Sequence, residues 1–422
     1  MNVEEFVGVR CYITRYEGIN GSFKENVEDF YVEEVADLKM GEGEWVIVRV
    51  KKRNWDTMNF VRVLSNKLRI SQKRIKFAGT KDKRAVSVQY FSIRVKDKSE
   101  VERLRDIKIK DAEIEIVGYS PKPIELGELR GNLFRVTIRK AKNVENIPKI
   151  EEELIARGTP NFFGLQRFGS IRFVTHEVGM CILKRDYENA FWIYVAKPFE
   201  GENEEARKVR EILWETRDVK FGLRELPKYL RYERVLLQKL RECGDEKRAL
   251  LSLPDNLKMM FVHAYQSYIF NNVLSDRIEE FKSLKVVEKG DWVDFVKLNE
   301  HYTFAEDFVR VHDYNYKRVK FLVERGMCSL AIPLPGYETK LGDDWTSERI
   351  RHYLERDGIT LKDFKHEFRE FSSKGSYRVA DMLIEHTNFK YELNEDVRFS
   401  FYLPKGCYAT VLLREFVKKP LF

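Results

Sequence analysis

Cysteine and histidine are sparse in this chain, and their spacing matches no metal site and no disulfide framework. Only five of the 422 residues are cysteines; they lie far apart, and none belongs to a CxxC or CxxH pair. The seven histidines form no HExxH or other ligand spacing. We therefore expect no bound metal, no network of disulfides, and a reduced, cytoplasmic protein.

Long apolar runs and phosphate-binding glycine loops are missing as well. No stretch approaches the roughly 18 apolar residues that a membrane span needs, and the first residues lack the apolar core of a secretory signal. We therefore expect no membrane partner. Neither a GxxxxGK[ST] loop nor a GxGxxG turn after a strand is present. An enzyme with this sequence is expected to use neither a nucleotide cofactor nor a metal.

Positive charge is abundant, and one acid stands alone within it. The net charge of +8 favours a polyanionic partner, most commonly nucleic acid. Eleven lysines and arginines lie between Thr57 and Lys96, and Asp82 is the only acid there. A carboxylate at the centre of such a surface repels phosphate and weakens the attraction of a polyanion. The residues alone leave two interpretations of Asp82 open, a loop cap or a catalytic group.

The hydrophobic pattern predicts an α+β fold in which a helical region interrupts a β-rich one. Expected strands lie at 44–51, 86–95, 133–140 and 397–403, with a returning strand at 408–416 after the turn Pro404-Lys405-Gly406. Expected helices lie at 57–68, 144–156, 203–219, 224–255, 257–280 and from Thr346 or Ser347 to 357, and Pro333–Gly336 is expected to be an irregular loop. We expect a first domain at 1–160 and 372–422, split by a mostly helical insertion at 161–371.

Six short segments stand out in chain order: DFYVEE at 29–34, FAGTKDKRAVSVQ at 77–89, GNLF at 131–134, PNFFGLQRFG at 160–169, AYQSY at 264–268 and LPKGCYAT at 403–410. Together they resemble signatures of the TruD family of tRNA pseudouridine synthases. The segments span nearly the whole chain, and residues 200–371 match least. The resemblance implies a mixed, mainly antiparallel pseudouridine synthase catalytic domain with an inserted TRUD domain.

The resemblance also implies a reaction and a partner. Family members isomerise uridine to pseudouridine in tRNA, at position 13, without a cofactor and after flipping the base out of its stack; other RNAs remain open as substrates. Asp82 is implied as the catalytic carboxylate. Attack on the sugar, attack on the base and removal of the 2′ proton are all open as its role. No feature of the sequence calls for a protein partner.

Four residues are implied in substrate binding, and each has a plainer interpretation. Phe134 resembles the aromatic that stacks on the flipped base, but it also fits a core position on an alternating strand. Asn132 resembles a residue that contacts the substrate, and it also fits a turn after Gly131. Phe30 and Phe401 match aromatic positions near the substrate, and both fit a hydrophobic core.

Two cations are implied as supporting residues. Lys24 is expected within hydrogen-bond reach of Asp82, where it would keep that carboxylate ionised; its alternative is a solvated surface lysine. Lys81 and Lys83 are expected to diverge from Asp82 towards phosphate. Arg167 is expected to meet phosphate, although the aromatic segment around it fits a packed joint between domains equally well.

Two other classes of function fit parts of the sequence. A non-catalytic RNA-binding protein would explain the basic stretch and the aromatics, but it gives Asp82 no purpose. A cofactor-dependent RNA methyltransferase would need a glycine fingerprint that is missing. Isomerisation leaves the mass of RNA unchanged, whereas methylation increases it.

Overall fold

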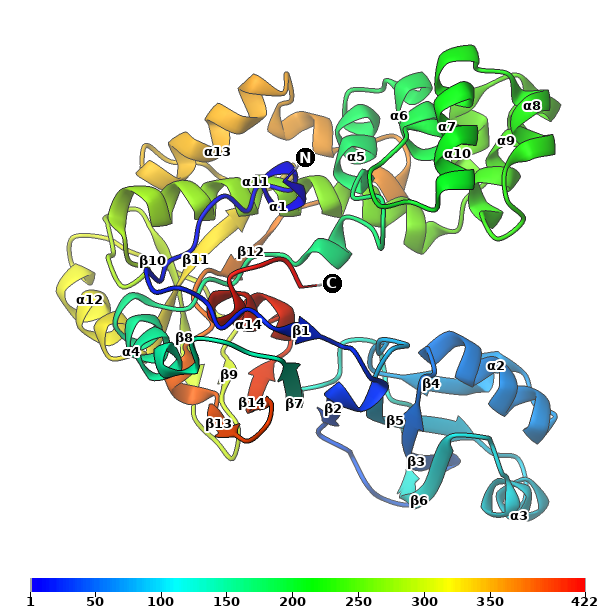
Figure 1. The fold of residues 1–422 in the computed structure, drawn as a ribbon, viewed down its shortest axis with the longest axis horizontal. Coiled ribbons are helices and arrows are strands. Elements are labelled where there is room, and N and C mark those ends of the chain that lie inside the picture. Colours follow the sequence, from blue (N-terminus) through cyan, green and yellow to red (C-terminus); the bar gives the residue numbers. More distant parts are fainter. Residues whose placement is uncertain (1, 422) are drawn as a thin grey trace.

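The computed structural model describes residues 2–421, which form two β-sheets and helices grouped around one long helix, α11 (Asp255–Phe281) (Figure 1). The larger sheet has nine strands in the order β13-β14-β7-β2-β5-β3-β6, with β1 paired to β7 and β4 to β5. Only the β2–β5 pair is parallel. The strands are β1 (Ser22–Phe23), β2 (Phe30–Val35), β3 (Trp45–Arg53), β4 (Ile75–Phe77), β5 (Val86–Arg94), β6 (Ala112–Ser120), β7 (Gly131–Arg139), β13 (Lys390–Leu393) and β14 (Val397–Pro404). The predicted α+β class with a mixed, mainly antiparallel sheet is confirmed.

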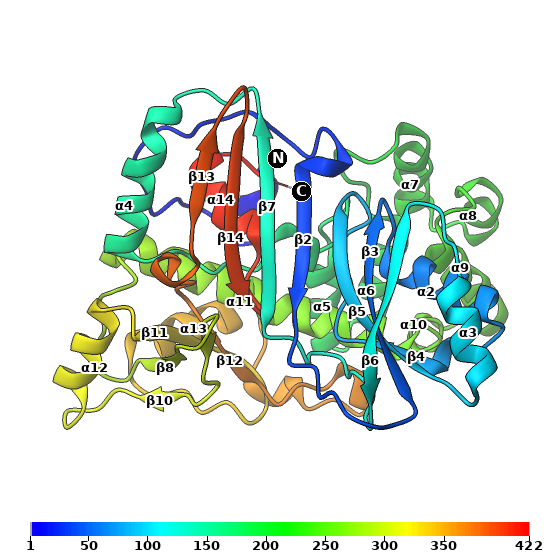
Figure 2. The same ribbon diagram turned by 90° about the horizontal axis from the view of Figure 1, so that it is seen from below.

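Helices cover the two halves of this sheet separately (Figure 2). Helix α2 (Thr57–Leu68) begins at Asp56, whose side chain accepts from the Asn59 amide, and with α3 (Lys98–Asp106) it packs on the β3–β5 half. Helices α4 (Ile147–Arg157) and α14 (Ala409–Val417) share a core with the β7–β14 half. The short helix α1 (Val3–Phe6) lies beside α11.

The returning strand predicted at 408–416 is wrong, because this segment forms helix α14. All its residues from Val411 to Val417 are buried, including Arg414, which is paired with Glu4. A short segment that is buried on all sides can form either a helix or a strand, so its pattern of apolar residues does not decide between them.

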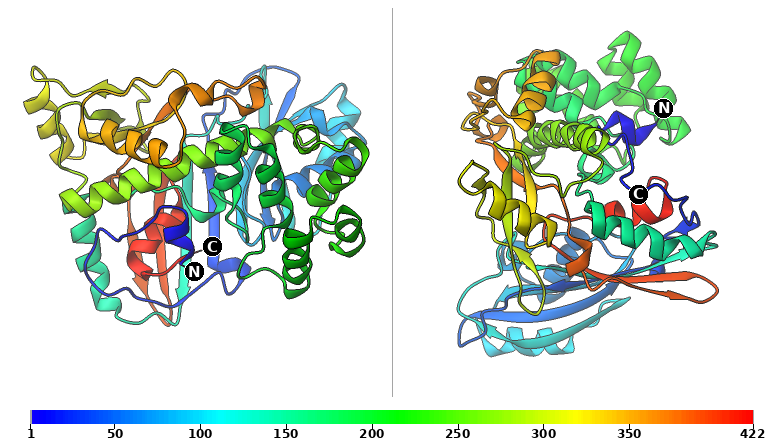
Figure 3. Two further views of the ribbon diagram at one scale, coloured as in Figure 1. Left: turned by 90° about the horizontal axis from the view of Figure 1, so that it is seen from above. Right: turned by 90° about the vertical axis from the view of Figure 1, so that its left-hand side faces the viewer.

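The region 161–371 has two parts on either side of α11 (Figure 3). Towards one end of α11 lie the helices α5 (Thr175–Leu183), α6 (Tyr187–Ala196), α7 (Glu204–Thr216), α8 (Val219–Glu225), α9 (Arg231–Cys243) and α10 (Glu246–Leu251). Pro227 and Gly244, whose φ is 62°, break the single helix predicted at 224–255. No helix of residues 2–421 has the length and apolarity to cross a membrane.

The other end holds a second sheet that the sequence did not predict. Its strands are β8 (Trp292–Lys297), β9 (Thr303–Phe304), β10 (Val309–Arg310), β11 (Cys328–Leu334) and β12 (Ser376–Val379), and helices α12 (Tyr316–Glu324) and α13 (Trp345–Arg356) accompany it. Of the loop predicted at Pro333–Gly336, the first two residues instead extend β11, and Pro335 and Gly336 lie outside the strand as expected. Pro333 is tolerated in β11 because residues 332–334 pair with β12 alone and need no amide donor on their other side. Asp344, rather than Thr346 or Ser347, caps α13. Strand β12 follows residue 371, so the second sheet includes a strand from beyond the predicted end of the insertion.

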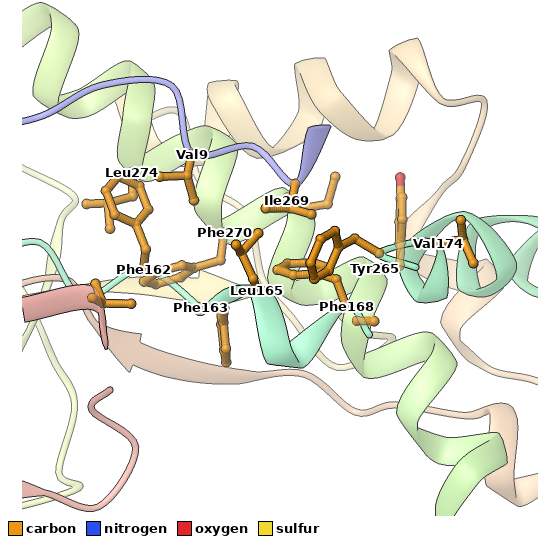
Figure 4. Packing of buried hydrophobic residues seen from close by; sticks show 14 of the residues in the cluster. Val9, Phe162, Phe163, Leu165, Phe168, Val174, Tyr265, Ile269, Phe270 and Leu274 are labelled. Atoms are coloured by element: carbon orange, nitrogen blue, oxygen red, sulfur yellow. The ribbon is translucent and has the colours of Figure 1, made fainter. Parts of the chain in front are cut away.

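The segment after Pro160 packs tightly on α11. Phe162, Phe163 and Phe168 are each less than 8% exposed, and they lie among Tyr265, Ile269, Phe270 and Leu274 of the helix (Figure 4). Asn271 of α11 accepts from the Phe163 amide and donates to the carbonyls of Phe163 and Val7. The predicted packed joint is therefore present, and it ties α11 to the N-terminal segment.

Candidate active site

Asp82 lies in the loop between β4 and β5, and neighbouring elements fix this loop. The Lys81 amide donates to Thr57 Oγ1 at 2.9 Å, at the start of α2. The Gln89 side chain, which is fully buried on β5, donates to the Gly79 carbonyl. Both anchors lie just before Asp82 in the chain, so they fix the segment that leads into it although the loop has no regular structure.

A cleft opens beside Asp82, between the larger sheet and the segments that cross it. Strands β2 and β7, the anchored loop, Gln166 and the start of α14 form its walls. The lining residues are Phe30, Val32, Thr80, Lys81, Asp82, Asn132, Phe134, Gln166, Cys407, Tyr408, Ala409 and Thr410. We call this the Asp82 cleft.

Lys24 pairs with Asp82, as the sequence led us to expect. Its Nζ lies 2.9 Å from Asp82 Oδ2, and Gln166 Nε2 donates to the same oxygen at 3.4 Å. The lysine side chain is only 9% exposed whereas the carboxylate is 38% exposed, so a nearly buried cation faces a carboxylate that substrate can reach. Lys24 has a φ of 53°, unusual for a residue with a side chain, and its ammonium lies 4.2 Å from the ring centroid of Phe30. It is not a solvated surface lysine.

Aromatic rings form the apolar wall of the cleft in two layers. Phe30 and Phe134 line it, with ring centroids 6.0 Å apart. Phe401 lies opposite Phe134 on β14 and stacks against it at 5.5 Å, but it is 3% exposed and is not among the lining residues. Phe401 therefore supports the position of the Phe134 ring from behind.

Asn132 belongs to a polar network at the inner end of the cleft. Its Oδ1 accepts from Lys81 Nζ at 2.9 Å, and the same ammonium lies 3.0 Å from Glu34 Oε2. Burial raises the pKa of the Glu34 carboxyl, and the Lys81 charge opposes that rise. The expectation that Lys81 turns outward to phosphate is wrong, since its side chain is only 7% exposed; Lys83 is exposed as expected.

Arg167 follows Gln166 in the chain, but its side chain turns to α11, where it donates to Ser267 Oγ at 3.1 Å. Its guanidinium lies 5.6 Å from the Phe163 ring centroid, and that of Arg378 lies 3.9 Å from the same ring. Burial lowers the pKa of both arginines. Within residues 2–421 neither forms an ion pair with a carboxylate.

Sequence reasoning missed several lining residues. Gln166 is 84 positions from Asp82, and its only signal is its place beside Arg167 in the PNFFGLQRFG segment. Tyr408 and Thr410 were assigned to a strand, whereas the start of α14 brings them to the cleft. No group of three histidine, cysteine, aspartate or glutamate side chains in residues 2–421 could hold a metal.

Comparisons with known proteins find relatives that match nearly the whole chain. The family model for tRNA pseudouridine synthase D (TruD) matches residues 6–416. A protein of Archaeoglobus fulgidus named as a tRNA pseudouridine synthase D is 59% identical over 99% of this chain and 100% of its own length. A similarly named protein of Pyrococcus abyssi is 38% identical over 96% and 98%.

A solved structure extends the similarity to three dimensions. The crystal structure of a tRNA pseudouridine synthase D from Methanosarcina mazei superposes with a TM-score of 0.81 at 38% identity, covering 99% of this chain and 98% of that one. The chain therefore belongs to the TruD family of tRNA pseudouridine synthases.

Proposed function

We propose that this protein isomerises uridine to pseudouridine in tRNA, at position 13 and without a cofactor, with Asp82 as the catalytic carboxylate. The observation that carries the proposal is the pair of Lys24 and Asp82 beside a cleft walled by Phe134. Family membership supports the reaction and the class of substrate. A protein that modifies tRNA would work in the cytoplasm, in keeping with its five unpaired cysteines.

The reaction breaks one bond of the nucleoside and forms another. The C1′–N1 bond is cleaved, the uracil turns over in the cleft, and C5 bonds to C1′; C5 gives up a proton and N1 gains one. Whether Asp82 adds to the sugar, adds to the base or takes the 2′ proton, it must be ionised and within reach of the nucleotide. The Lys24 ammonium donates to the carboxylate at 2.9 Å, and the 38% exposure of the Asp82 side chain leaves room for the nucleotide to approach.

The aromatic wall suits a base that has left its stack. A flipped uracil loses the neighbours on both of its faces, and stacking on an aromatic ring replaces one of them. Phe134 would offer this ring, with Phe30 beside it and Phe401 behind it.

The remainder of the tRNA needs a basic surface. Arg167 and Arg378 carry charges without a carboxylate partner, so a phosphate near Phe163 would meet two unneutralised cations. We propose residues 1–160 and 372–422 as the catalytic domain and residues 161–371 as the inserted domain that grips the tRNA body. The β11–β12 pairing joins the end of the insertion to the segment that follows it.

The test is direct. The purified full-length chain is incubated with an unmodified tRNA transcript in buffer without additives, and pseudouridine is mapped by a chemical adduct while the RNA mass is measured. Pseudouridine at position 13 with unchanged mass is expected. A gain of one methyl mass on addition of a methyl donor would favour a methyltransferase, and RNA binding with no modified nucleoside would favour a pure RNA-binding protein.

A further inference from the structure

The side chain of Lys81 turns inward, away from the RNA-facing surface, and joins two strands. Its Nζ lies 2.9 Å from Asn132 Oδ1 on β7 and 3.0 Å from Glu34 Oε2 on β2. Glu34 and Asn132 are directly opposite each other in the β2–β7 pair, so their side chains share one face of the sheet. Glu34 is fully buried and Lys81 is 7% exposed.

This contact determines which end of the Asn132 amide faces the cleft. An ammonium group has three donors and no acceptor, so only the carbonyl oxygen of the amide can face it favourably. Turning the amide over would place its N–H₂ group against the ammonium, which the buried Glu34 carboxylate holds in place. Asn132 lines the cleft, and no acceptor within residues 2–421 bonds to its Nδ2. The cleft therefore contains one free amide donor at this point.

We infer that Lys81 and Glu34 are positioning residues that hold Asn132 as a hydrogen-bond donor to the C4 carbonyl oxygen of the incoming uridine, and that this donor selects uracil over cytosine. The inference rests on the proposed function. Uracil has carbonyl groups at C2 and C4, whereas cytosine has an amine at C4. A donor that faces an amine leaves both groups without a partner, and buried unpaired groups account for strong rejection of near-identical substrates.

The symmetry of uracil fits a fixed donor of this kind. An axis through N3 and C6 exchanges N1 with C5 and C2 with C4. When the base turns over about this axis, C5 arrives where N1 was, and the two carbonyl oxygens exchange places. A single donor then serves one carbonyl in uridine and the other in pseudouridine, without moving. Cytosine lacks this equivalence, because its amine and carbonyl would exchange.

Binding measurements separate this role from a purely structural one. In an Asp82→Asn background, which prevents turnover, dissociation constants are measured for two tRNA transcripts that differ only in uridine or cytidine at position 13. The Asp82→Asn protein should bind the uridine transcript at least about tenfold more tightly than the cytidine transcript. A difference of this size is within the range of one well-placed hydrogen-bonding contact to a base. A structural role for Lys81 would change affinity for both transcripts equally.

Two added substitutions test the orientation of the amide. Asn132→Asp keeps the contact with Lys81 but offers the base only an acceptor, so the uridine preference should disappear or reverse. The double substitution Glu34→Gln with Lys81→Met replaces both members of the pair with uncharged side chains of nearly the same shape and frees the amide to turn. The ratio of the dissociation constants for the cytidine and uridine transcripts should then fall towards one. Lys83→Met removes an exposed neighbouring cation that takes no part in the pair, and it is the matched control. Loss of a phosphate contact would weaken binding of both transcripts equally, so its ratio should stay within about twofold of the Asp82→Asn protein.

The possible results are distinguishable. An unchanged uridine preference in the Asn132→Asp protein overturns the inference, and this result does not depend on whether the Glu34→Gln/Lys81→Met protein folds. Equal binding of both transcripts by the Asp82→Asn protein also overturns it. If the wild-type chain also forms no pseudouridine, the proposed function fails instead. Loss of preference in Asn132→Asp and in the Glu34→Gln/Lys81→Met protein, with retention in Lys83→Met, supports the inference.

Discussion

Two lysine–carboxylate pairs meet at adjacent positions of one loop, and they differ in their exposure to water. Lys24 pairs with Asp82, whose carboxylate is 38% exposed in the cleft. Lys81 pairs with Glu34, and these side chains are 7% and 0% exposed. The same chemical pair therefore occurs in two settings: beside the cleft it leaves a carboxylate accessible, and beneath the cleft it fixes the position of neighbouring groups.

The largest expected effect on stability is at the buried pair. Lys81→Met should lower the free energy of unfolding by about 3–5 kcal/mol, because it leaves the Glu34 carboxylate buried without its cation. Lys24→Met should cost no more than about 1 kcal/mol, since the Asp82 carboxylate left behind can be hydrated. Urea denaturation of both variants measures the difference.

A second substitution checks the cause of that loss. Adding Glu34→Gln to Lys81→Met removes the unpaired carboxylate and should recover most of the stability. Equal losses for Lys24→Met and Lys81→Met would show that exposure does not distinguish the two pairs.

An intermediate effect is expected at the apolar wall beside the exposed pair. Phe134→Ala should weaken binding of the target nucleotide by roughly 1–3 kcal/mol through loss of a base–aromatic stack, whereas Phe134→Tyr retains the ring and should be mild. Single-turnover rates and RNA affinities measure the effect. Because Phe134 also packs on Phe401, circular dichroism is the control, and a collapsed fold in the Ala variant would favour a core role alone.

The smallest effect is a pH dependence arising near the buried pair. Burial, and then the nearby charge of Lys81, lowers the pKa of Lys52 from its ordinary value of 10.5 to about 8. Between these two values the unfolded chain keeps a proton on Lys52 that the folded protein has released, so the free energy of unfolding should rise with pH across this window. The rise should be smaller in Lys52→Met.

A matched control for this prediction is the neighbouring residue on β3. Lys51 is exposed and lies 3.5 Å from Glu113 in a surface ion pair, so Lys51→Met should leave the pH dependence unchanged. Urea denaturation from pH 8 to pH 10 measures how the free energy of unfolding changes with pH. If this change is the same in the wild type and in Lys52→Met, Lys52 is not its source.

The sequence predicted several elements whose two faces differ in polarity, although it missed β2 and β6, which alternate in the same way. Strand β7 alternates buried Phe134, Val136 and Ile138 with more exposed residues, and α2 begins at its aspartate cap. The sequence failed where both faces are buried, as in α14, and where strands are only two residues long, as in β9 and β10. Such segments take their conformation from tertiary packing, which leaves no local pattern.

Within the candidate site, the family resemblance supplied the residues but not their orientations. The Lys24–Asp82 contact followed from a matched position in another segment. The inward turn of Lys81 did not, because it depends on the bond between the Lys81 amide and Thr57 and on a buried glutamate one strand away. These are long-range contacts, and in an irregular loop the direction of a side chain cannot be obtained from spacing.

One measurement tests the central account most directly: the single-turnover rate of pseudouridine formation at position 13 of tRNA by the Asp82→Asn protein, with RNA affinity determined on the same sample. The substitution is nearly isosteric and removes one negative charge from a basic surface. The account predicts a rate below about a hundredth of the wild-type rate, because loss of a nucleophile or base typically costs far more than that, with RNA affinity equal to or slightly above that of the wild type. An Asn protein that retains a larger share of the rate, or that loses activity only because it no longer binds tRNA, would contradict it.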